Sequence, residues 1–436
     1  MIVGASAPGK PAATQEARRL QGFVFALFFI FGGVTSLNDV VIPKLKALFT
    51  LTYGEALLVQ TAFFGAYLIV SIPAALLVDR VGYLRGAALG LLTMMAGCLL
   101  FIPAAQSAAF PFFLLALFVL ASGVTLVQVV ANPLISMLGR PETVHARLTF
   151  AQGFNSLGTT VLPFAGALLI LGSLAHGAAA PHPTGEALAA FRRTESGAVV
   201  RAYTELAAVL ALAAFAVWVQ RRKLPVVRAE RRNPLHAFAI LGRPRVVFGA
   251  VCIFLYVGAE VAVGSLLVGY LSQPGALALS VAQAGRMAPF YWGGAMVGRF
   301  LGAGVLRRAS PGLMLAGAAF GAIGLLLLSG TSHGFLCGVA LLAVGFCNSI
   351  MFPTVFSLAC EGLDVQAAAD ASGVICVAIF GGAVIPPLAG LVADQVGLRA
   401  ALFVPAACYA IVLAFGLYTA LGPPPGGRPC PGPDPV

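Results

Sequence analysis

Charged side chains are scarce in this chain, where they make up only 9% of the 436 residues. A soluble domain carries about 25% Asp, Glu, Lys and Arg, so this composition excludes one. The eight cysteines form no CxxC pair, and no His or Cys cluster has metal-ligand spacing, which argues against a disulfide framework and a metal site. The string GxxxxGK[ST] is absent, so direct drive by ATP is not expected. We expect neither an enzyme nor a cofactor.

Apolar residues are abundant instead, at 60% of the chain with a mean hydropathy of +0.96. They gather in runs of about 20 residues, the length that crosses roughly 30 Å of hydrocarbon. The runs lie near residues 22–49, 55–78, 86–105, 110–138, 148–171, 199–220, 246–271, 281–306, 311–329, 334–360, 368–392 and 400–421. The sequence therefore predicts an all-α membrane protein with twelve transmembrane helices in a lipid bilayer.

A basic segment separates the first six runs from the last six. It holds eight Lys or Arg and a single acid, Glu230. The net charge of +11 lies mainly in short loops, which is typical of cytoplasmic loops rather than of nucleic-acid binding, and it places both termini in the cytoplasm. No apolar stretch precedes the first basic pair, so no cleavable signal peptide is expected. The predicted divisions are an N-terminal tail (1–21), a first bundle (22–220), a basic linker (221–245), a second bundle (246–421) and a disordered Pro- and Gly-rich tail (422–436).

The two sets of runs resemble each other. Gln128 stands five residues before a proline, and 220 positions later Asn348 does the same. Asp39 and Glu260 are 221 positions apart, and the string P-x-A-G at Pro163 recurs after 224. Two parallel six-helix halves are the signature of the major facilitator architecture, whose site lies between the halves near the middle of the bilayer.

Amide side chains interrupt the apolar runs in a helical pattern. Gln128 and Asn132 are four residues apart and Gln152 and Asn155 three apart, so each pair shares a helix face. Unpaired polar groups at bilayer depth cost several kcal/mol each, so these faces should meet protein or water. With Asn348 they predict a site for a polar, uncharged ligand; interhelical hydrogen bonding is the structural alternative.

Two acids stand inside predicted spans. A charge at bilayer depth costs about 2.5 to 3.5 kcal/mol on insertion scales, and such residues are functional by default. Asp39 in the first run could instead pair with Lys44 or Lys46 at the interface, and Glu260 could be a protonated structural residue. We expect Asp39 and Glu260 to couple transport to protons.

Several strings together point to a family. They are TSLNDVVIPKLKALF, the ANP segment, AQGFNSLGTT, YVGAEVAVGSLLVGYL, NSIMFPTVFSLACEGL and GGAVIPPLAGLVAD. These resemble the fucose, galactose and glucose proton symporter family over essentially every helix. The resemblance implies a bacterial inner-membrane sugar carrier driven by protons. Fucose permeases carry a glutamate at the position of Gln128, so this chain is more similar to the glucose and galactose branch.

Aromatic rings stack on the C–H faces of sugars, and carboxylates and amides pair with sugar hydroxyls. Phe64 and Tyr67 are further aromatic candidates, although packing is the commoner role of an aromatic residue in a membrane helix. The residues that we expect to bind a sugar are Asn38, Asp39, Gln128, Asn132, Gln152, Asn155, Tyr256, Glu260, Trp292 and Asn348.

The loop string VDRVGYLRG is similar to the superfamily motif between the second and third helices. Gly82 permits a tight turn, while Asp79, Arg80 and Arg85 can pair across helix ends and lock one state of a rocking cycle. The motif predicts gating, with a positive-inside signal as the alternative. We interpret His145 and Arg147 as solvated loop residues.

These observations predict a monomeric secondary transporter that takes up a hexose such as glucose or galactose together with protons. Sodium coupling, facilitated transport, and carriage of N-acetylglucosamine or fucose are open alternatives. A multidrug exporter would need a more apolar cavity with fewer amides, and a membrane sugar sensor would move no solute.

Overall fold

The computed structural model describes residues 19–36, 53–107, 110–166, 186–221 and 239–422. Throughout these residues the regular secondary structure is helical. The helices are Arg19–Ser36 (the first helix), α2 Tyr53–Val81, α3 Tyr83–Ser107, α4 Phe110–Met137, η1 Pro141–Thr143, α5 Val144–Gly166, α6 Glu186–Gln220, α7 Pro244–Leu271, α8 Val281–Gly285, α9 Ala288–Val305, α10 Pro311–Thr331, α11 Phe335–Asn348, α12 Met351–Ala359, α13 Val365–Ala378, α14 Gly381–Val396, α15 Leu398–Ala401 and α16 Phe403–Leu421.

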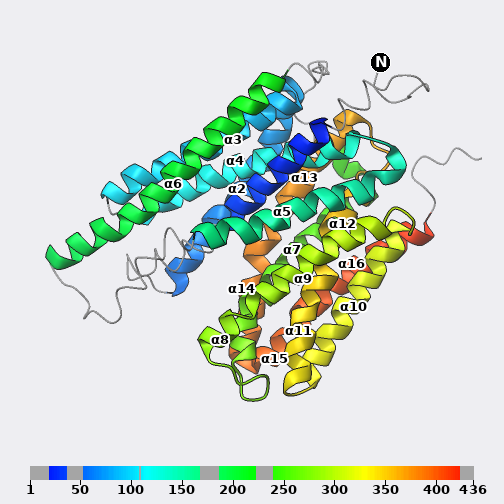
Figure 1. Cartoon of the computed structure of the whole chain (residues 1–436). Helices are drawn as coiled ribbons and strands as arrows, with labels where there is room; N and C mark the ends of the chain where they lie inside the picture. Colours follow the sequence, from blue (N-terminus) through cyan, green and yellow to red (C-terminus); the bar gives the residue numbers. More distant parts are fainter. Residues whose placement is uncertain (1–18, 37–52, 108–109, 167–185, 222–238, 423–436) are drawn as a thin grey trace, which may run out of the picture.

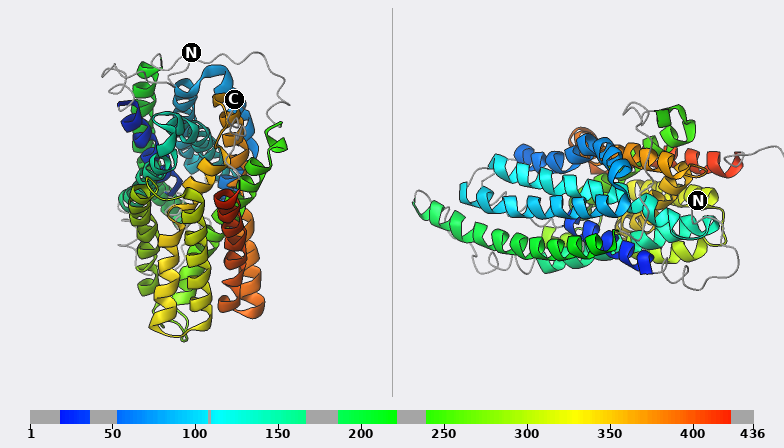
Figure 2. Two further views of the ribbon diagram at one scale, coloured as in Figure 1. Left: turned by 90° about the vertical axis from the view of Figure 1, so that its right-hand side faces the viewer. Right: turned by 90° about the horizontal axis from the view of Figure 1, so that it is seen from above.

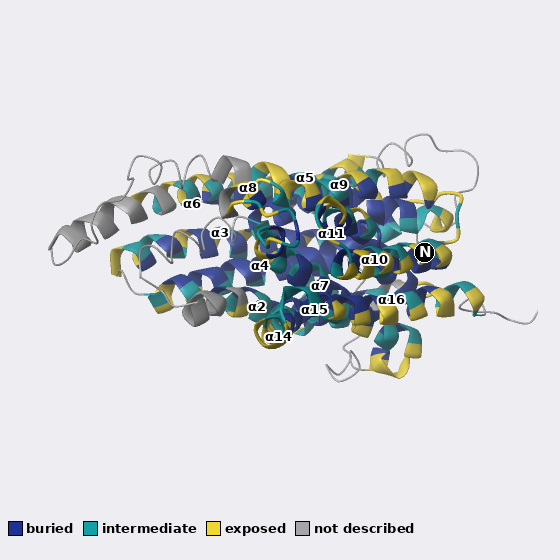
Figure 3. Ribbon diagram, turned by 90° about the horizontal axis from the view of Figure 1, so that it is seen from below, coloured by how far each residue is buried: buried dark blue, intermediate teal, exposed yellow. Residues whose placement is uncertain are grey.

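Within the described part, ten helices or helix pairs are long and apolar enough to cross a membrane. The pairs α11–α12, α13–α14 and α15–α16 each continue one span. Helices α5 and α9 occupy the remaining two positions of the predicted twelve. Large apolar side chains cover the outer surface, such as Leu212 and Phe320, which are 70% and 69% exposed. Figure 3 shows buried residues concentrated toward the centre and exposed ones on the outer helix faces, the distribution expected for a protein surrounded by lipid.

Prolines and short irregular turns divide several of the predicted helices. The run expected as one helix at 281–306 is broken between α8 and α9, where Pro289 occupies the first turn of α9 and supplies no amide hydrogen. The run at 334–360 is similarly divided at Ser349 and Ile350, shortly before Pro353. Helix α6 begins at Glu186, 13 residues earlier than the apolar run, because hydropathy does not detect its polar first turns.

The helices form two groups, one made of the first helix and α2 to α6 and the other of α7 to α16 (Figure 1). We call the end of the molecule with the turns at Gly82, 138–143, 306–310 and 360–364 the basic end, because Arg80, Arg85 and Arg140 lie there. The two groups meet toward this end and diverge away from it (Figure 1), and the view from above in Figure 2 shows the helices of the first half extending away to one side.

Contacts between the two halves run from the middle of the helices to the basic end. A Cβ on Gly373 of α13 would lie 2.8 Å from Ala75 of α2, and one on Gly153 of α5 would lie 2.7 Å from Phe300 of α9. The Ser372 hydroxyl donates to the Val129 carbonyl oxygen of α4 at 3.1 Å. The halves are therefore closed at the basic end.

Candidate functional site

A proline in α12 leaves a backbone carbonyl oxygen free to accept a hydrogen bond at the centre of the second half. Pro353 has no amide hydrogen, so the carbonyl of Ser349, four residues earlier, lacks its usual helical donor. The Nε of Arg299 on α9 donates to this oxygen at 3.2 Å. Pro133 frees the carbonyl of Val129 in α4 in the same way, and there the donor is Ser372 from the opposite half. The repeated prolines thus create acceptors on both sides of the interface.

Glu260 lies on α7 in a ring of polar side chains from the second half. Its Oε1 atom is buried and has no hydrogen-bond partner among the described residues. The hydroxyl of Tyr291 on α9 donates to the Glu260 carbonyl oxygen at 3.2 Å. Tyr256, one turn earlier on α7, and Arg299 both interact electrostatically with the Glu260 carboxyl group. Acids inside membrane helices mark substrate pathways and proton relays, so this carboxyl group is a candidate for proton transfer.

Asn348 ends α11 beside this carboxyl group. Its Nδ2 donates to the Tyr291 hydroxyl at 2.8 Å, whereas its Oδ1 is buried without a partner among the described residues. The Tyr256 hydroxyl donates to the Asn348 carbonyl oxygen at 3.1 Å. Trp292 meets Tyr291 edge-on and is 41% exposed, so it lies outside this buried group.

The first half contributes a second set of amides. Asn132 on α4 is fully buried, and neither atom of its amide has a partner among the described residues. One turn earlier, the Gln128 Oε1 accepts from the Tyr67 hydroxyl of α2 at 3.0 Å. An unpartnered amide can both donate to and accept from a hydroxylated ligand.

The two predicted amides of α5 point to different neighbours. Gln152 is buried at the interface, with its Nε2 unpartnered, and its backbone oxygen accepts from Arg299 at 3.2 Å. Asn155 instead lies against the first helix, where its Nδ2 is 3.5 Å from the Phe28 carbonyl oxygen and a Cβ on Gly32 would overlap its side chain. The structure thus joins Gln152 to the group around Glu260 and places Asn155 in a helix–helix contact.

Asn38 and Asp39, which were predicted to bind sugar, lie outside the described residues.

The loop motif VDRVGYLRG lies within the described residues. Gly82 links α2 to α3 with a φ of +85°, the left-handed conformation that glycine adopts most easily. Asp79 and Asp370 of α13 both interact with Tyr83, so the motif faces the second half, whereas Arg80 and Arg85 are exposed.

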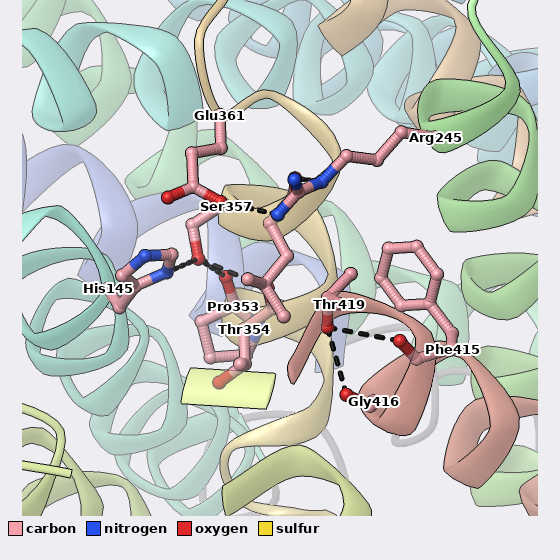
Figure 4. A network of polar contacts seen from close by, with 10 residues as sticks. His145, Arg245, Pro353, Thr354, Ser357, Glu361, Phe415, Gly416 and Thr419 are labelled. Carbon is pink, nitrogen blue, oxygen red and sulfur yellow. Dashed lines mark hydrogen bonds and ion pairs between the residues drawn. The ribbon is translucent and has the colours of Figure 1, made fainter. Parts of the chain in front are cut away.

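The interpretation of His145 and Arg147 as solvated residues is wrong. Arg147 is only 9% exposed, and its guanidinium donates to the carbonyl oxygens of Ile135 and Ser136 at 2.7 and 2.6 Å, which caps the end of α4. His145 Nδ1 is 2.7 Å from the Ser357 hydroxyl of α12 (Figure 4). The polar sequence predicted a loop here, but α5 begins at Val144, so that Arg147 is buried and His145 partly buried against other helices.

Arg299 is the main residue that sequence reasoning missed. It is 8% exposed at the interface between the halves. The sequence did contain a signal for Arg299, because a charged residue inside the predicted run at 281–306 is expected to be functional for the same reason as Glu260. Tyr291 and Tyr409 were also missed, because only the packing of α9 and α16 against α7 reveals that they interact with Glu260.

Comparison with known proteins agrees with this architecture. The model of the Major Facilitator Superfamily matches residues 24–385. A Glucose/galactose transporter from Brucella abortus biovar 1 (strain 9-941) is 45% identical over 391 residues, which are 90% of this chain and 92% of that protein. The L-fucose-proton symporter of Escherichia coli (strain K12) is 32% identical over 90% of this chain and 91% of its own length.

The chain belongs to the fucose, galactose and glucose proton symporter family of the major facilitator superfamily. The predicted fold class and family are confirmed by these matches. This transporter also matches the crystal structure of FucP in the outward conformation with a TM-score of 0.83 and 28% identity, covering 93% of this chain and 99% of that one. A putative glucose/galactose transporter of Helicobacter pylori (strain J99 / ATCC 700824) is 40% identical over 91% of this chain and 95% of its own length.

Proposed function

We propose that this transporter takes up a hexose, glucose or galactose, together with protons. The observation that carries the proposal is the group of buried, unpartnered polar atoms on both sides of the interface, from Asn132, Gln152, Glu260 and Asn348. Apolar ligands would leave these atoms unsatisfied, whereas a sugar offers hydroxyls that donate and accept. The names of the relatives from Brucella and Helicobacter support the same substrate class.

The proposed cycle is alternating access. The basic end is closed in this structure, so the sugar enters from the opposite end and binds between the amides of the two halves. Protonation of Asp39 or Glu260 accompanies binding, the halves then rock about the bound sugar, and sugar and proton leave at the basic end. The Gly82 motif, with Asp79, Arg80 and Arg85, supports the closed state of this end.

The placement in the cell follows from charge. Basic loops favour the cytoplasm, so the basic end, both termini and the linker 221–245 face inward across a bacterial inner membrane. The proposed functional unit is one chain with its bundles at 22–220 and 246–421, because a site between two halves of one chain needs no second copy.

The test is uptake of labelled glucose, galactose, mannose, fucose and N-acetylglucosamine into proteoliposomes, with and without an inward proton gradient. We expect one hexose to accumulate above equilibrium and a protonophore to abolish the accumulation. Equilibration that ignores the proton gradient would instead identify a facilitator or, if sodium restores accumulation, a sodium symporter. If N-acetylglucosamine is the preferred substrate, we would infer that the amide side chains of the site bind its acetamido group.

Asp39→Asn tests the proton role within the same assay. The neutral side chain keeps its hydrogen-bonding capacity but cannot release a proton, so the variant should lose uphill accumulation and retain sugar exchange. Full accumulation by Asp39→Asn would remove Asp39 from the coupling mechanism.

A further inference from the structure

Arg299 is a buried cation placed between the two halves. Its guanidinium donates to the Gln152 carbonyl oxygen and to the Ser156 hydroxyl of α5, while its Nε holds the Ser349 carbonyl oxygen of its own half. None of the ion pairs in the described part of the chain involves Arg299. Its positive charge is therefore solvated by dipoles from both halves, and these bonds close the interface.

Among the described residues, Glu260 is the acid that interacts with this cation. The connection is contiguous, because Arg299 binds Ser349, the neighbouring Asn348 carbonyl oxygen accepts from Tyr256, and Tyr256 stands one turn from Glu260. An ionised carboxylate attracts a guanidinium through a full opposite charge, whereas a neutral carbonyl or hydroxyl oxygen offers only a dipole. When Glu260 is protonated, the Arg299 guanidinium keeps its hydrogen bonds to the oxygens of α5. When Glu260 is ionised, its carboxylate competes with those oxygens for the guanidinium.

Among the described residues, Arg299 is the cation that interacts with the Glu260 carboxyl group. In the described part of the chain, the other titratable side chains that interact with Glu260 are Tyr256 on α7, Tyr291 on α9 and Tyr409 on α16. Helix α14 packs on the same segment of α7 through Ile385, an apolar residue that would overlap a Cβ on Gly258.

We propose that Arg299 is a positioning residue that prevents protons from crossing without sugar. While Glu260 carries a proton, Arg299 stays on α5 and keeps the basic end closed, so the proton cannot pass from the Glu260 carboxyl group to water on that side. Sugar bound at the Gln152 side chain disturbs the same segment of α5 and permits opening. This inference rests on the proposed function, with Glu260 as a proton carrier.

The experiment measures proton entry into proteoliposomes that contain a trapped pH-sensitive dye, in the absence of sugar. Arg299→Gln should raise the leak about tenfold over wild type, because it removes charge-assisted bonds across the interface. Arg299→Lys keeps the charge but not the forked geometry and should leak to an intermediate extent. Arg286→Gln, at an exposed position beside α8, is the matched control and should behave as wild type.

The double variant Arg299→Gln/Glu260→Gln distinguishes this mechanism from general loosening. It should lose the leak, because the group that carries the proton is gone; a leak that persists overturns the proposal. Thermal unfolding in detergent reports the folding of each variant, and loss of sugar counterflow in both single Arg299 variants would also overturn the proposal, since Arg299 would then be needed for sugar movement itself. Wild-type protein that fails to accumulate sugar would refute the proposed function. If wild-type protein accumulates sugar but Arg299→Gln shows no increased proton leak, this inference alone would be refuted.

Discussion

Asn132 shows how stability and function oppose each other at a single residue. Its side chain is fully buried on α4, and both amide atoms are without partners among the described residues. Burying such a group costs about 1 to 3 kcal/mol on protein scales. A purely structural role would not explain this cost, whereas a ligand that satisfies the amide would.

Asn132→Leu should therefore raise the melting temperature while it weakens sugar binding. Leucine has a similar size and removes the unsatisfied amide, and the lost ligand bonds should raise KM about tenfold. Thermal unfolding in detergent and uptake kinetics measure the two effects. Asn348→Leu is the contrast, because it breaks the bond to Tyr291 and should lower the melting temperature; a lower melting temperature for Asn132→Leu as well would contradict this view of the site.

At the scale of helices, close approach of backbones replaces the hydrophobic effect as the source of association in lipid. A Cβ on Gly258 of α7 would overlap Ile385 and come within 2.8 Å of the Gly381 carbonyl oxygen of α14. Small residues at such crossings let helices gain van der Waals contact along their backbones. The α7–α14 crossing supports Glu260, two residues further along α7.

Gly258→Ala should consequently destabilise the protein by about 1 to 3 kcal/mol through overpacking. The matched control is Gly324→Ala on α10, where a Cβ meets nothing within 4 Å. We expect a clear drop in melting temperature for the first variant and no drop for the second, by fluorescence-detected thermal unfolding. Equal stability of both variants would show that α7 and α14 can separate without cost.

Element boundaries also show where sequence reasoning succeeded and failed. Long apolar runs predicted the existence of the helices well, because each helix must span a hydrocarbon layer of fixed thickness. The breaks at Met287 and Ser349 were missed, since hydropathy does not register the amide hydrogens that Pro289 and Pro353 lack. These breaks matter for the site, because one of them frees the carbonyl oxygen that binds Arg299.

For the whole molecule, closure of the basic end partly buries a histidine. His145 stands in the first turn of α5, ahead of the apolar run at 148–171, where its Nδ1 lies 2.7 Å from the Ser357 hydroxyl of the other half (Figure 4) and its ring interacts with the Arg245 charge. Burial, assisted by the Arg245 charge, lowers the pKa of His145 to about 4. In an open state with water around it, its pKa returns toward about 6.5.

Acidification should therefore open the basic end. The open state binds more protons between pH 6.5 and 4, so closure is fully favoured above about pH 6.5 and weakens as the pH falls toward 4, with no further change below. Hydrogen–deuterium exchange of residues 144–156, corrected for the intrinsic pH dependence of exchange, should rise by up to about tenfold per pH unit in this window.

His145→Gln should abolish this pH dependence, because glutamine can still bond Ser357 but does not titrate. His333→Gln, on an exposed histidine at the opposite end, should retain it. An unchanged exchange profile in His145→Gln would assign the opening to another group.

The sequence by itself determined the membrane environment, the twofold repeat and the family, because hydrocarbon thickness, the spacing of amides and acids, and the helix strings are all properties of the linear chain. It also placed Glu260 and the amides of α4 and α5 inside the spans. Only the tertiary structure decided their partners: it directs Gln152 to the interface and Asn155 to the first helix, and brings Arg299 across to α5. The physical reason is that helical periodicity specifies which residues share a face, whereas the packing of helices distant in sequence specifies what that face meets.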